Sequence, residues 1–139
     1  MRPHTPRVVS VIVGHPAVWF LARLALRGAY LLGGLTKLTD WQGALAEQAH
    51  FGVALPALSA ALTIAVELIG PLLILSGQLV WLGSGMLGVF TLLAAIVANN
   101  FWAMPEGQDR FMAMNAFFEH IGLIGGFVLV AMLADRRER

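Results

Sequence analysis

Residues 55–98 read LPALSAALTIAVELIGPLLILSGQLVWLGSGMLGVFTLLAAIVA, and this stretch decides the fold of the chain. Glu67 is its one charged residue, and the pair Gly77 and Gln78 divides it into two apolar runs, 55–76 and 79–98. Each run has the roughly 17 to 25 residues with which a helix crosses the hydrocarbon core of a bilayer. Because so short a break joins them, we expect two transmembrane helices in a tight antiparallel hairpin.

Two further apolar runs of membrane-spanning length flank this hairpin, at residues 17–35 and 116–134. In none of the four runs do apolar and polar residues alternate as they would in a barrel strand. Small residues recur at every fourth position in all of them, and this spacing lets helices approach closely in lipid. The sequence therefore predicts an all-α integral membrane protein, a four-transmembrane-helix bundle that forms one domain over residues 1–139.

The composition agrees with a membrane protein, since 58% of the residues are hydrophobic and only 12% are charged. In soluble domains about a quarter of the residues are charged, so this chain has too few polar side chains to cover a water-soluble fold. A formal net charge of +1 leaves no positive surplus for phosphate backbones, which argues against nucleic acid as a partner. The chain has no cysteine, and that excludes disulfides, thiolate metal sites and thiol relays.

The polar connections between the predicted spans set the expected topology. Residues 36–54 hold Glu47, Gln48 and His50 among alanines, so we expect an interfacial helix or loop cap whose polar side faces water. Residues 99–115 form a second polar connection on that side. Basic residues near membrane ends are retained in the cytoplasm, and most of them flank the termini, so both termini should be cytoplasmic. They are Arg2, Arg7, Arg136, Arg137 and Arg139, against Lys37 and Arg110 on the opposite side.

Polar groups inside the apolar spans are the main candidates for function, because a charge in the middle of a bilayer is costly. The predicted buried polar core consists of Arg23, Arg27, Tyr30, Glu67, Glu119 and His120. One interpretation is that this core holds a quinone headgroup, a proton relay or a small substrate. The other is an ion-pair network that only fixes the order of the helices.

Within this set we expect Glu67 to pair with Arg27. From the helical rise, Arg27 lies roughly 15 Å from the start of its span, and Glu67 lies roughly 14 Å from the matching end of the next span. Arg23, at roughly 9 Å, is a poorer match in depth but has a long side chain. Consecutive antiparallel helices are usually neighbours, and an unpaired charge at this depth needs a partner.

A second candidate site is a pocket on the outer face, built from both polar connections by His50, Asn99, Asn100 and Trp102. For the aromatic residues of this region the alternative is an interfacial belt, which is common where helices leave the membrane. The histidines of the chain are too scattered to have the spacing of metal ligands, so we predict no metal site.

Several motifs point to a family by their order and spacing: Arg23 with GGLTK at 33–37, Glu67 with Gly70 and Pro71, NNFW at 99–102, and Gly122 with Gly125 and Gly126. Together they resemble the DoxX family of small four-helix bacterial membrane proteins. That family usually has a histidine where this chain has Asn99 and Asn100, and a lysine-asparagine pair in place of Glu119 and His120. The resemblance implies a multi-pass protein of the bacterial inner membrane that serves membrane redox chemistry.

Three functions remain open. The first is a small subunit or partner of a quinone-linked or oxidative-stress system, with quinone as the candidate cofactor and without catalysis of its own. The second is a transporter or a binding protein for hydrophobic small molecules, and the third is a membrane scaffold or assembly factor. Besides the lipid bilayer, we expect a protein partner in a membrane complex or a second copy of the chain.

Overall fold

The computed structural model describes the backbone of residues 5–138 and the side chains of residues 5–136. Every regular element in this range is helical: α1 (Arg7–Gly14), α2 (Pro16–Thr39), α3 (Trp41–His50), α4 (Pro56–Ser76), α5 (Val80–Ala98), the 3-10 turn η1 (Phe101–Ala103) and α6 (Gln108–Glu138). By length and composition, α2, α4, α5 and α6 can each cross a membrane. The predicted all-α fold with four membrane-spanning helices is confirmed, and its environment is a lipid bilayer.

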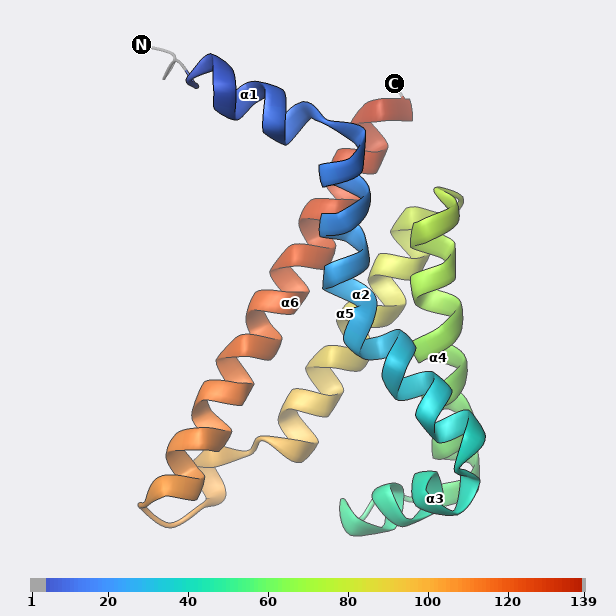
Figure 1. Cartoon of the computed structure of the whole chain (residues 1–139). Helices are drawn as coiled ribbons and strands as arrows, with labels where there is room; N and C mark the ends of the chain where they lie inside the picture. Colours follow the sequence, from blue (N-terminus) through green and yellow to red (C-terminus); the bar gives the residue numbers. More distant parts are fainter. Residues whose placement is uncertain (1–4, 139) are drawn as a thin grey trace.

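The four long helices run up and down and place both ends of the chain at one end of the bundle (Figure 1). We call this end, which carries α1 and the last turns of α6, the terminal face. The opposite end carries α3 and η1, and we call it the loop face. Helix α4 packs between α2 and α5, and α5 packs against α6, so the helices are neighbours in the order α2, α4, α5, α6.

Close helix packing in the centre depends on glycine at a few positions. A Cβ atom at Gly83 of α5 would lie 2.6 Å from the backbone oxygen of Gly70 in α4, so the two backbones touch there. A Cβ atom at Gly34 of α2 would meet Leu68 of α4 at 2.8 Å. By contrast, Gly122 has no atom of the described chain within 4 Å of the corresponding point, so no close contact among the described residues requires its small size.

The helix boundaries differ from the predicted ones mainly at the loop face. Helix α2 continues past residue 35 to Thr39, because the first strong stop is Asp40, whose side chain accepts a hydrogen bond from the Gly43 amide at 2.9 Å and starts α3. Helix α6 begins at Gln108 instead of 116, directly after Gly107, whose φ of 150° breaks the chain direction. The polar residues of both extensions had marked them as connections, but polar residues do not by themselves end a helix.

The segment 36–54 contains a helix, α3, which is one of the two forms expected for it. One of its polar residues, Gln48, is buried and does not face water. Helix α3 packs against α2 and α4 with Ala44 and Gln48, which are 2% and 9% exposed. Gln48 was expected on the water side, and this expectation is wrong, because positions four apart share one helix face and Ala44 faces the bundle. Glu47 points outward, with 42% of its side chain exposed.

Candidate functional site

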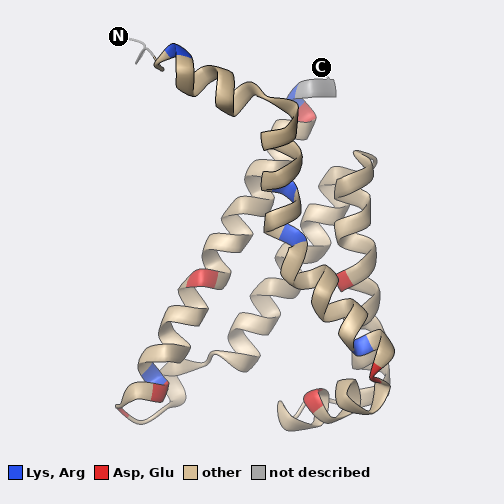
Figure 2. Cartoon of the chain, in the orientation of Figure 1, with Lys and Arg blue, Asp and Glu red and all other residues tan. Residues whose placement is uncertain are grey.

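An ion pair inside the bundle joins the loop-face end of α2 to the middle of α4. Lys37 Nζ lies 3.3 Å from Glu67 Oε1 and 3.2 Å from Glu67 Oε2, and the two side chains are only 16% and 8% exposed. Gly33 makes room for the carboxylate, since a Cβ there would lie 3.2 Å from Glu67 Oε1. Lys37 also lies 3.4 Å from Glu47 Oε2, so the charges continue outward to α3. Figure 2 shows charged positions on α2, α3 and α4, of which that on α3 lies at the loop face.

The predicted pairing of Glu67 with Arg27 is wrong. Arg27 has no exposed surface, and within the described chain none of its three side-chain nitrogens has a hydrogen-bond partner. The prediction assumed that the start of α2 and the end of α4 lie at the same level. Instead α2 extends beyond α4 at the terminal face, because Arg23 Nη2 donates to the backbone oxygen of Ile74, two residues before the end of α4, at 2.8 Å.

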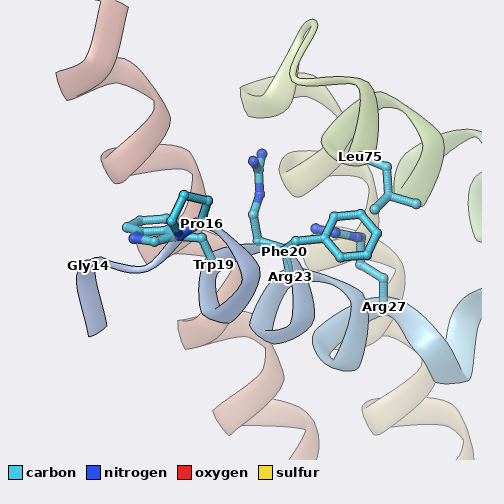
Figure 3. Close-up of a pocket in the computed structure, with 7 residues that line it drawn as sticks. All are labelled: Gly14, Pro16, Trp19, Phe20, Arg23, Arg27 and Leu75. Carbon is cyan, nitrogen blue, oxygen red and sulfur yellow. The ribbon is translucent and has the colours of Figure 1, made fainter. Parts of the chain in front are cut away.

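The two arginines line one cavity at the terminal face, which we call the arginine cavity. Its volume is about 230 Å³, and its walls are Gly14, Pro16, Trp19, Phe20, Arg23, Arg27 and Leu75 (Figure 3). Local sequence explains its position, since Gly14, His15 and Pro16 end α1 and start α2. His15 Nδ1 accepts a hydrogen bond from the Ala17 amide at 3.2 Å, which caps α2. The cavity therefore lies at the bend between α1 and α2.

Tyr30, which shares one face of α2 with Arg23 and Arg27, has a structural role. Its hydroxyl lies 2.6 Å from Thr91 Oγ1 of α5, and Thr91 in turn donates to the Leu87 carbonyl at 2.6 Å. Because a threonine hydroxyl has one proton, Tyr30 is the donor of this pair. The ring packs edge to face on Phe127 of α6, with centroids 5.5 Å apart. Tyr30 thereby joins α2 to both α5 and α6.

Two predicted core residues lie outside the core. Glu119 is exposed on α6, and His120 is half-buried, with Nδ1 2.7 Å from the backbone oxygen of Ala116 in its own helix. Helix α6 contacts α5 extensively but touches α2 only slightly, and the exposure of Glu119 shows that no described helix covers its position. The sequence pattern located these polar groups on α6 but did not show which face packs.

The predicted outer-face pocket does not form among the described residues. His50 is exposed and packs on Phe51, with ring centroids 5.0 Å apart, at the end of α3. Trp102 belongs to η1, which packs on α6, whereas α3 packs on α2 and α4. Its ring lies 5.6 Å from that of Phe117. Asn99 and Asn100 are half-buried on the α5–η1 side, so His50 is separated from the other three residues (Figure 1).

Three residues take part in these polar contacts but are not among the predicted site residues: Lys37, Glu47 and Thr91. A signal for Lys37 existed, because it lies seven residues after Tyr30 and so continues the polar stripe of Arg23, Arg27 and Tyr30. It was assigned to the connection instead, since the apolar run ended at residue 35. Thr91 gives no comparable signal, because a lone threonine in an apolar helix is common.

Comparison with known proteins gives the family. The family model described as DoxX matches residues 18–100, which include α2, α4, α5 and the Lys37–Glu67 pair. The chain is also similar to Inner membrane protein YphA of Escherichia coli (strain K12), with 23% identity over 129 residues, 93% of this chain and 91% of that protein. No solved structure matches the chain. The match covers more than half of the sequence and confirms the resemblance seen in the motifs: this chain belongs to the DoxX family.

Proposed function

We propose that this protein is a small subunit or partner of a membrane redox system, quinone-linked or directed against oxidative stress, in the bacterial inner membrane. Membership of the DoxX family supports the redox association, and the name of the Escherichia coli relative supports the inner-membrane location. The chain has no cysteine and no paired histidines at metal-ligand spacing, so electron transfer falls to the partner. Quinone is the cofactor class that such a system implies.

The observation that carries the partner role is the exposed carboxylate of Glu119. It lies roughly 16 Å along α6 from the loop-face end, inside a helix that is long and apolar enough to cross a membrane. A charged side chain facing lipid near the bilayer centre costs about 2.5 to 3.5 kcal/mol even on the mildest scale. A partner helix with a hydrogen-bond donor at this depth would remove that cost. Polar contacts of this kind hold membrane helices together.

The test compares the wild type, a deletion strain and Glu119→Leu in the native host. We expect gentle solubilisation to yield the wild-type chain in a complex with a quinone-linked or peroxide-removing enzyme, and Glu119→Leu to yield it alone. Membrane vesicles should show lower quinone-dependent electron transfer, or cells lower peroxide resistance, in both altered strains. Glu106→Gln, at an exposed position between η1 and α6, is the control and should behave as the wild type.

Two results would overturn this proposal. One is a wild-type chain that migrates without a redox enzyme after solubilisation in several mild detergents. The other is a deletion strain whose quinone-dependent electron transfer and peroxide resistance both equal those of the wild type.

A second candidate function, the binding of a hydrophobic small molecule, is favoured by the arginine cavity alone. Quinone carbonyls accept hydrogen bonds, and Arg27 carries donors that have no partner within the described chain, so the donor set fits a quinone headgroup. A neutral quinone would nevertheless leave Arg27 without a counter-charge among the described residues. Quenching of tryptophan fluorescence by a soluble quinone, lost in Arg27→Gln, would support this candidate, and equal quenching in both would contradict it.

A further inference from the structure

We propose that the arginine cavity binds the oxyanion of a phosphate group, carried either by the headgroup of a membrane phospholipid or by free phosphate. This inference goes beyond the partner role, because it concerns α2 and the terminal face, whereas the proposed partner contact lies on α6.

The first observation is a buried arginine without a partner. Arg27 is 0% exposed, and Nε, Nη1 and Nη2 have no hydrogen-bond partner in the described chain. An arginine side chain carries five N–H donors in a rigid planar fork and stays charged in proteins. Burying such a group unpaired is strongly unfavourable, so the site is incomplete without an acceptor. The fork matches two oxygens of one phosphate group.

The second observation is a neighbouring charge of the same sign. Arg23 lies one helical turn before Arg27, on the same face of α2, and both line the cavity. Like charges at this spacing repel each other and destabilise a helix. Glu67, the buried acid on the neighbouring helix α4, pairs with Lys37 and not with either arginine. An oxyanion between the two arginines would turn this repulsion into two attractions, which a neutral ligand cannot do.

The third observation is the level of the cavity relative to the membrane surface. Arg23 bonds to Ile74 and Leu75 lines the cavity, while α4 ends at Ser76. The cavity is therefore level with the last turn of α4, where the chain turns back into α5. Phospholipid phosphates lie at such helix ends, and arginine side chains commonly extend toward them. Trp19, another wall residue, is of a type enriched at this boundary.

The cavity is large enough for a phosphate group, but the Phe20 side chain must move before the group can reach Arg27. A volume of about 230 Å³ exceeds that of several waters, which occupy about 30 Å³ each, so a group of five heavy atoms fits. Figure 3 shows the Phe20 ring in front of the Arg27 guanidinium. Phe20 is 55% exposed, so its ring can turn away and open Arg27 to the ligand. Arg23 would make the first contact.

The experiment measures thermal unfolding of the full chain in a non-ionic detergent while one compound at a time is titrated. The compounds are short-chain phosphatidylglycerol, inorganic phosphate, a phosphate-free glycosyl diacylglycerol and a soluble quinone, all at matched ionic strength. Ligands that bind only the folded state raise the unfolding temperature, and the concentration dependence gives the apparent affinity. The variants are Arg27→Gln and Arg27→Lys. Arg136→Gln is the control, because Arg136 is an exposed cation at the same face.

We expect phosphatidylglycerol to stabilise the wild type and the control equally, and to bind at least tenfold more weakly to Arg27→Gln. Arg27→Lys keeps the charge but loses the planar fork, so its affinity should also fall, and this variant serves the test if Arg27→Gln does not fold. Stabilisation by the lipid but not by inorganic phosphate assigns the headgroup as the source. Stabilisation by inorganic phosphate as well would show that the site also binds free phosphate.

Three outcomes would overturn the proposal. The glycosyl lipid could stabilise as well as phosphatidylglycerol, which would mean that the acyl chains bind. Arg27→Gln could bind phosphatidylglycerol as tightly as the wild type does. Finally, the quinone alone could stabilise the wild type, and this would support the redox proposal while removing the phosphate site. Loss of the redox partner in Glu119→Leu tests the other proposal separately.

Discussion

Substitution of the Lys37–Glu67 pair gives the sharpest test of how the bundle is held together. Two unit charges 3.2 Å apart, the separation of Lys37 Nζ and Glu67 Oε2, attract by about 5 kcal/mol at an effective dielectric constant of about 20. Desolvation offsets much of this attraction, so the pair contributes less than the full value to folding. Removing one partner is different. Without Lys37, Glu67 stays buried and unpaired, and without Glu67, Lys37 keeps only the exposed Glu47, and stranding a buried charge typically costs about 3 to 5 kcal/mol.

We therefore expect Glu67→Gln and Lys37→Met each to lower the free energy of unfolding by about 3 kcal/mol, near the low end of that range because Lys37 retains some solvent. The double variant strands no charge. Its loss should be no larger than that of either single variant, which corresponds to a coupling energy of at least about 3 kcal/mol. Unfolding by a denaturing detergent in mixed micelles, followed by circular dichroism, measures all four proteins on one scale.

Glu47→Gln is the matched control for this cycle. Glu47 lies at nearly the same distance from Lys37, 3.4 Å, but its side chain is 42% exposed. Exposed pairs contribute at most about 1 kcal/mol, so this variant should stay within that limit. If the double variant instead loses the sum of the single losses, about 6 kcal/mol, the charges act independently and the pairing is refuted.

The remaining predictions concern packing and topology. Tyr30→Phe should cost about 1 kcal/mol of unfolding free energy, because it removes the hydrogen bond to Thr91 but keeps the ring; no measurable loss would contradict that bond's contribution. Gly83→Ala should destabilise by about 1 to 3 kcal/mol, since the new Cβ meets the Gly70 backbone, whereas Gly85→Ala, with open space around it, should not; equal melting temperatures would refute the close contact. A reporter that is active only outside the cytoplasm, fused to the C-terminus, should give no signal, and a strong signal would reverse the predicted orientation.

The orientation still depends on charge counts, and part of that count lies outside the described residues. Arg2 and Arg139 belong to the parts of the chain that the structure does not describe, while Arg7 and Arg136 lie at the terminal face with α1 and the end of α6. The structure places both termini at one end of the bundle, as four spans require (Figure 1). Which side of the membrane that end faces remains a prediction that the reporter fusion tests.

Hydropathy along the sequence was enough to predict the fold, because lipid leaves a chain few choices. A backbone in hydrocarbon must satisfy its own hydrogen bonds, so an apolar run of spanning length becomes a helix. The short break at Gly77 and Gln78 also sufficed for the hairpin of α4 and α5, since Gly77 adopts the left-handed conformation that ends α4. The polar ends of α2 and α6 were missed because hydropathy identifies apolar segments and does not show how far a helix continues into polar sequence.

The polar contacts were less predictable, because they depend on how far one helix is shifted along another. Arg27 and Glu67 have matching distances from their helix ends, yet Arg27 lies beside Leu75 in the last turn of α4, whereas Glu67, in the middle of α4, contacts Lys37 in the last turn of α2. The shift is set by close contacts such as that of Gly34 with Leu68, which only the packed structure reveals. Likewise, nothing in the α6 pattern showed that Glu119 would face away from α5.

These contacts divide the polar residues of the bundle into satisfied and unsatisfied groups, and the division separates architecture from function. Lys37, Glu67, Tyr30 and Thr91 satisfy one another within the chain, so replacing them in matched pairs should preserve both folding and the activity of the membrane system. Arg27 and Glu119 have no such partner among the described residues: one is buried beside a cavity and the other is exposed on a membrane helix. A fold gains nothing from an unpaired charge in either place. A ligand at the first and a protein partner at the second would each supply the missing acceptor or donor, so function should depend on these two residues even where their replacement leaves the bundle equally stable.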